Sequence, residues 1–203
     1  MGFTQVSLHS HASICRLYVR LIFSDNRRML RIALYFWQMC LLRAGPEKVP
    51  ASLPVMSLVL AAYLLIAFIS ANITRPAASS GALLGSLLIG VVVECTLVYG
   101  ILRFKKFSPR AIPTLISLFG TNAIILLLLM ALNLVLVYPE IKLLGMLAES
   151  AFWLIFFWWM AIVGYILHKA MNISVFLGVA IAFTLELLTN LASQALFPTQ
   201  QLS

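Results

Sequence analysis

Two carboxylates, Glu94 and Glu186, stand deep inside long apolar stretches of the sequence, where an ionisable side chain is costly. Side chains of this kind usually face the protein interior or water. Two chemistries are open to them. A neutral carboxyl can donate a hydrogen bond to a neighbouring helix. A charged one can carry protons or cations along a pathway through the membrane.

Amide side chains accompany these carboxylates. Glu94 lies roughly 12 Å before the end of its stretch, and Asn122 lies roughly 14 Å after the start of the next one. These two ends flank the same loop, so the residues lie at nearly equal depths and we expect a hydrogen bond between them. Asn133 lies three turns beyond Asn122 on one stripe, and Asn190 follows Glu186 by one turn. These five residues are the candidate intramembrane site.

The elements that carry these residues read as membrane spans. Hydrophobic residues make up 63% of the 203 residues and charged residues 10%, against roughly 45–50% and about 25% in average globular chains. This balance excludes a water-soluble enzyme, a secreted disulfide scaffold and a disordered chain. Five apolar stretches are long enough to cross a bilayer. They are 55–73, 81–102, 113–137, 146–167 and 173–196.

Helices are expected for these stretches, because lipid offers backbone groups no hydrogen-bonding partners. The predicted fold is therefore an all-α membrane protein, a five-transmembrane-helix bundle within residues 53–197, followed by a short tail at 198–203. The positions of the polar residues predict that the third span packs between the second and the fifth.

Basic residues set the expected orientation. Twelve of the fourteen Lys and Arg residues lie before the first span or in the loops after the second and fourth spans. The positive-inside rule then places the N-terminus in the cytoplasm and the C-terminus in the periplasm of a bacterial inner membrane. The basic residues expected at the membrane surface are Arg27, Arg28, Arg31, Arg43, Arg103, Lys105, Lys106 and Arg110.

The segment before the first span has two parts. Residues 1–28 are polar, and two interpretations remain open: a cytoplasmic tail, or an upstream extension ahead of a true start at Met29. Residues 29–52 comprise a short amphipathic helix and a linker. The apolar run from Met29 is too short to span, so we expect it to lie in the membrane interface. It serves either as an anchor or as a helix that binds a partner.

The sequence lacks the HExxH, P-loop and GxSxG motifs. His168, at the end of the fourth span, has no acid or nucleophile near it in sequence to complete a catalytic group. We therefore expect no enzymatic activity, no catalytic residue, no metal site and no cofactor. The net charge of +8 is explained by orientation in the membrane, so nucleic acid is not an expected partner.

Three stretches together are similar to a family of uncharacterised small inner-membrane proteins of Gram-negative bacteria. They are Arg43-Ala-Gly-Pro46 with Pro50-Ala-Ser52, the run from Thr114 to Ile125, and His168-Lys-Ala170 with Ser174 and Gly178. More distantly, five spans after a cytoplasmic N-terminus resemble the Yip1 family of membrane-trafficking adaptors. The Asp-Leu-Tyr-Gly-Pro motif of that family is absent. The resemblance implies no functional residues.

The first functional hypothesis is a non-enzymatic adaptor or assembly protein that binds a membrane-protein partner or a second copy of itself. The alternative is a small proton- or cation-coupled transporter that uses Glu94 and Glu186. A third, weaker hypothesis is lipid binding by the aromatic residues of the fourth span. A polar cavity that reaches Glu186 would favour transport, and a dry, packed bundle would favour the adaptor.

Overall fold

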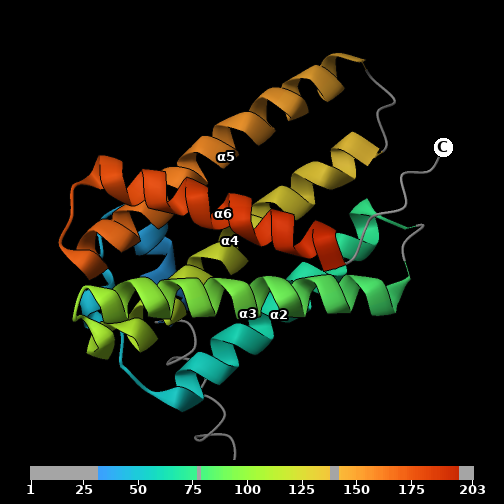
Figure 1. Ribbon diagram of the computed structural model, residues 1–203. Helices are drawn as coiled ribbons and strands as arrows, with labels where there is room; N and C mark the ends of the chain where they lie inside the picture. Colours follow the sequence, from blue (N-terminus) through green and yellow to red (C-terminus); the bar gives the residue numbers. More distant parts are fainter. Residues whose placement is uncertain (1–31, 77–78, 138–141, 197–203) are drawn as a thin grey trace, which may run out of the picture. The chain divides into compact units, whose positions relative to one another are not determined.

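The computed structural model of the protein describes residues 32–76, 79–137 and 142–196, which are almost entirely helical and contain no strand. Five long helices account for most of them (Figure 1). They are α2 (Leu53–Thr74), α3 (Ser80–Phe104), α4 (Ala111–Val137), α5 (Lys142–Met171) and α6 (Val175–Leu196). Two short 3-10 helices, η1 (Pro46–Lys48) and η2 (Ser108–Arg110), precede α2 and α4.

Each of the five long helices is long and apolar enough to cross a membrane. This confirms the predicted fold class, and the observed helices cover all five predicted spans, with ends within a few residues of the expected ones. The chain is thus a multi-pass membrane protein. A further helix at residues 32–40 precedes the bundle. The chain divides after Tyr35 into an N-terminal unit and a larger unit that begins at Phe36, and the contacts given below are those of the larger unit.

Three helices end at residues with a left-handed backbone and without glycine. The φ angles are 59° at Leu42, 64° at Lys106 and 54° at Asn172. In each case the next N–H bonds back across the turn, to the carbonyl five residues earlier. This arrangement satisfies carbonyls that the helix end leaves open. All three turns lie on the side of the bundle where α3 and α5 end and α4 and α6 begin.

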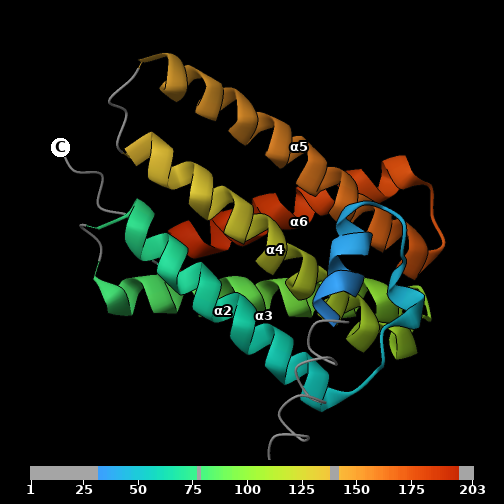
Figure 2. The same cartoon turned by 180° about the vertical axis from the view of Figure 1, so that it is seen from behind.

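The neighbours of each helix follow the order α2, α4, α5, α6, α3 and back to α2. The helices therefore form a ring that differs from their order in the chain. Figure 2 shows α4 between α2 and α5, and Figure 1 shows α6 beside α3. The second, third and fifth spans are α3, α4 and α6. The prediction that the third span packs between the second and the fifth is wrong, because α4 packs between α2 and α5. Four of the five polar residues selected from the sequence, all except Asn133, line a common cavity instead of joining these helices in pairs.

The first half of α4 is buried on almost every side. Ile116 and Phe119 are fully buried, and the ring of Phe119 lies 5.4 Å from that of Tyr63 in α2. Small and hydroxyl-bearing residues make this close packing feasible. The buried hydroxyls of Thr114 and Ser117 donate to carbonyls four residues earlier, those of Arg110 at the end of η2 and of Pro113 in α4, at 2.6 Å and 2.7 Å. The helix therefore buries polar atoms without leaving them unsatisfied.

The part of the preceding helix that belongs to the larger unit, residues 36–40, packs against this half of α4. Phe36, Met39 and Cys40 are buried, whereas Trp37 is exposed. The Phe36 ring lies so close to α4 that a Cβ added at Gly120 would sit 2.5–2.6 Å from its atoms.

A second close approach joins α5 and α6 near the turn between them. A Cβ added at Gly164 would lie 2.8 Å from the backbone nitrogen of Val179, and one at Gly178 would lie 3.2 Å from that of His168. His168 also bonds the carbonyl of Ile173 through Nδ1, which closes the turn. From this contact the two helices diverge toward their other ends (Figure 1).

The variant Gly178→Ala should lower the free energy of unfolding by about 1–3 kcal/mol, because its Cβ meets backbone atoms that cannot rotate away. Gly100→Ala is the matched control, since nothing lies within 4 Å of a Cβ there. The control should be neutral or stabilising by up to about 1 kcal/mol. Unfolding in detergent micelles, followed by circular dichroism, measures both. Equal stability of the two variants would contradict the close approach.

Burial raises the pKa of the Cys40 thiol to about 11. Because only the thiolate reacts, Cys40 should be alkylated at pH 8 roughly 100 times more slowly than a thiol with the ordinary value, and steric protection adds to this. N-ethylmaleimide labelling, followed by mass spectrometry in a Cys15→Ser, Cys95→Ser background, measures the rate. Phe36→Ala should accelerate labelling. A rate equal to that of the denatured chain would show that this helix does not pack on α4.

Candidate functional site

A cavity of about 480 Å³ lies within the ring, and all five long helices contribute to its walls. Most of the lining is apolar. The polar and aromatic residues that matter below are Tyr63, Glu94, Asn122, Trp159, Glu186 and Asn190. Four of the five intramembrane residues selected from the sequence therefore meet at one cavity, although they come from three different helices.

The two carboxylates face each other across this cavity from α3 and α6. Both residues line the same cavity, and α3 and α6 are direct neighbours. Within the described part of the chain, Glu94 makes no hydrogen bond, so its carboxylate is open to the cavity. Glu186 accepts one hydrogen bond at 2.7 Å from the amide of Asn190, one turn further along α6. Both carboxylates keep oxygen atoms available for a ligand.

Asn122 does not bond Glu94, so that prediction is wrong. Its side-chain oxygen instead accepts a hydrogen bond of 2.8 Å from the indole N–H of Trp159 in α5. The reason is the order of the helices, because α5 is a direct neighbour of α4 whereas α3 touches α4 only lightly. The bond holds the Trp159 ring at the cavity wall and leaves the amide nitrogen of Asn122 without a partner in the described residues.

Asn133 is the one predicted residue that does not line the cavity. It lies on the same stripe of α4 as Asn122, but the cavity wall on α4 ends at Leu129. Counting residues from the ends of their spans places Asn133 nearly level with Asn190 in the bilayer. The two are not brought together, because α4 and α6 are not neighbours in the ring.

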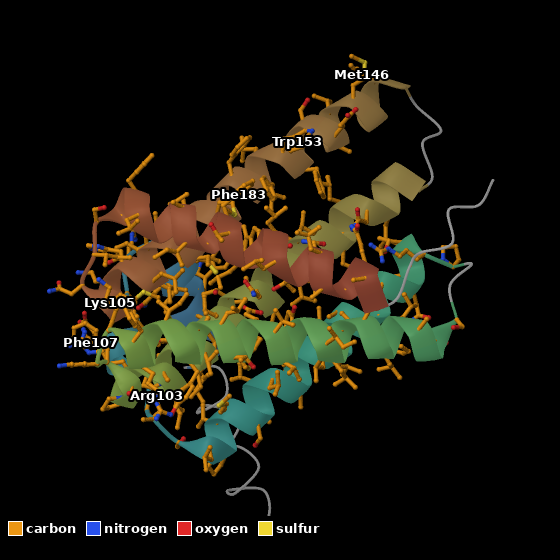
Figure 3. All side chains as sticks on the ribbon, in the orientation of Figure 1. Arg103, Lys105, Phe107, Met146, Trp153 and Phe183 are labelled. Atoms are coloured by element: carbon orange, nitrogen blue, oxygen red, sulfur yellow. The ribbon has the colours of Figure 1, made fainter. Side chains whose placement is uncertain are left out.

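The aromatic residues of α5 divide between two surfaces. Phe152, Phe156 and Trp159 line the cavity, and the rings of Phe156 and Trp159 are 5.9 Å apart. Trp153 and Phe157 are 53% and 65% exposed and lie on the outer face of the helix, where Figure 3 shows Trp153 pointing away from the bundle. The sequence alone did not indicate which of these rings would face inward.

The described basic residues of the predicted membrane surface lie at one end of the bundle. Arg103 and Lys105 project from the end of α3 (Figure 3). Arg103, Lys105, Lys106, Arg110 and Arg43 are all exposed. Arg110 lies 5.0 Å above the ring of Phe107 and donates to the carbonyl of Ala170 at 3.4 Å. Arg27, Arg28 and Arg31 lie outside the described residues. The cavity reaches toward the opposite end, where Arg75 follows α2.

The chain matches no protein-family model, no curated protein and no solved structure. The chemistry of the site must therefore be argued from its own geometry. That geometry is two facing carboxylates, an amide and an indole held by a hydrogen bond, and a wall of apolar side chains.

A double-mutant cycle should detect the Trp159–Asn122 bond. Trp159→Phe should cost about 1 kcal/mol of unfolding free energy, and the coupling to Asn122→Leu should be about 0.6–1.7 kcal/mol. Trp153→Phe, on the outer face, should change stability by less than about 0.5 kcal/mol. Unfolding in micelles, followed by tryptophan emission, provides the measurement. Additive effects of the two inner variants would show that the bond is absent.

Proposed function

We propose that this protein is a small proton- or cation-coupled transporter in which Glu94 and Glu186 bind the transported ion. The supporting observation is the cavity that contains both carboxylates. A dry bundle with every polar group paired would have favoured the adaptor hypothesis. The adaptor and the Yip1-like role stay predictions, because no contact among the described residues bears on them.

The energetics of the site support this proposal. A carboxylate that serves only as interhelical glue should end in a hydrogen bond to another helix. Glu94 has none in the described residues, and the bond of Glu186 is to its own helix. Two nearby carboxylates also repel when both are charged, so a proton or a cation between them lowers the energy of the site.

Access to the site differs between the two ends of the bundle. The cavity extends toward Arg75, which is exposed. On the other side, Ile116 in α4 and Ile162 and Ile166 in α5 are fully buried and fill the bundle. If the basic end faces the cytoplasm, as the charge distribution predicts, the cavity opens toward the periplasm. Transport then requires a second state in which the packed side opens.

Reconstituted protein should carry protons or cations into liposomes, and Glu94→Gln or Glu186→Gln should lower the flux by about tenfold or more, because each removes one ion-binding carboxylate. Glu149→Gln is the matched control, because Glu149 is exposed on α5 and does not line the cavity. A pH-sensitive dye inside the liposomes records proton flux under an imposed membrane potential. Unchanged flux in both cavity variants would refute the proposal.

A further inference from the structure

The size of the cavity bears on which cation it accepts. A volume of about 480 Å³ falls within the range of small-molecule sites, roughly 300–1,000 Å³. A proton needs no such space. Calcium needs about six to eight oxygen ligands, whereas no cluster of three or more His, Cys, Asp or Glu residues lies in the described part of the chain. The space and the few oxygen ligands favour an organic ion.

The walls of the cavity suit an ion with an apolar body. On α5, Phe152, Phe156 and Trp159 present rings to the space that the carboxylates of α3 and α6 also line. Aromatic faces attract organic cations through their quadrupole as well as through apolar contact. The bond from Trp159 to Asn122 fixes one of these rings before any ligand arrives, which lowers the entropy lost on binding.

The described residues place no positive charge beside the two carboxylates. From the other helices, Tyr63 of α2, Asn122 of α4 and Trp159 of α5 line the cavity together with Glu94 and Glu186. Arg75 is the one basic residue that lines the cavity among the residues that the structure describes. It lies twelve residues beyond Tyr63, roughly 18 Å along α2, and therefore at the rim, too far from the carboxylates to neutralise them.

We propose that the cavity binds a monovalent organic cation with an apolar body, such as a quaternary or protonated amine. Its charged group lies between Glu94 and Glu186, and its apolar part rests on Phe156 and Trp159. This names the cargo of the proposed transporter, and so it rests on that function for its purpose. The binding itself can be measured separately.

Benzyltrimethylammonium is a suitable probe, because it joins a quaternary ammonium to an aromatic ring. Titration calorimetry on the full chain in lipid nanodiscs should show saturable binding. N,N-dimethylbenzamide, an uncharged aromatic molecule of similar size, should bind at least about tenfold more weakly. In wild-type protein, titrations in two buffers of different ionisation enthalpy should reveal proton release, because the cation replaces protons on the carboxylates.

Variants separate the contributions of the two walls. The double variant Glu94→Gln, Glu186→Gln keeps the side-chain shapes and should abolish binding, whereas Glu149→Gln should bind as wild type does. Phe156→Leu should weaken binding about threefold to tenfold, because it removes a ring and keeps an apolar side chain.

Three results would overturn the inference: equal affinity for the cation and the amide, binding without proton release, or binding that survives the double variant. Its failure can be told apart from that of the transport proposal. Proton flux without binding of the probe would overturn only the organic cargo. Binding without any flux would overturn only transport.

Discussion

Polar groups that enter hydrocarbon must find partners within the protein, because lipid supplies none. This constraint accounts for the placement of almost every polar side chain in the bundle. The hydroxyls of Thr114 and Ser117 in α4 donate to backbone carbonyls four residues earlier. The indole N–H groups of Trp158 and Trp159 donate to the carbonyl of Cys40 and to Asn122. The carboxylates of α3 and α6 share the central cavity.

The constraint also separates a packing role from a binding role. The indole bonds consume a donor and an acceptor each, and so they fix the positions of helices. The carboxylate of Glu94 makes no hydrogen bond among the described residues and lines the cavity. A fold that needed only stability would be better served by an apolar residue there, because an unpaired polar group in a dry interior is costly. The cavity lowers this free-energy cost, because it leaves room for a ligand beside the carboxylate.

Length and hydropathy were enough to predict the spans, because both signals lie within one segment of the sequence. The depth of a residue then follows from the rise per residue. It was harder to predict which helices pack against one another. This depends on close approaches such as those of Phe36 to Gly120 and of α6 to Gly164, and neither partner is apparent from one helix alone. The left-handed turns at Leu42 and Lys106 could not be predicted, because neither position has the glycine that usually marks such a turn.

The order of the ring also bears on how the protein is made. α3 leaves the ribosome early, yet its most extensive contacts are with α6, the last long helix of the chain. Glu186 is synthesised 92 residues after Glu94, which at about 5–20 residues per second corresponds to roughly 5–20 s. During that interval Glu94 belongs to a loosely held pair of helices, α2 and α3. Until α6 arrives to close the ring, the nascent chain must shelter an acidic side chain by other means, such as a bound proton or the insertion machinery.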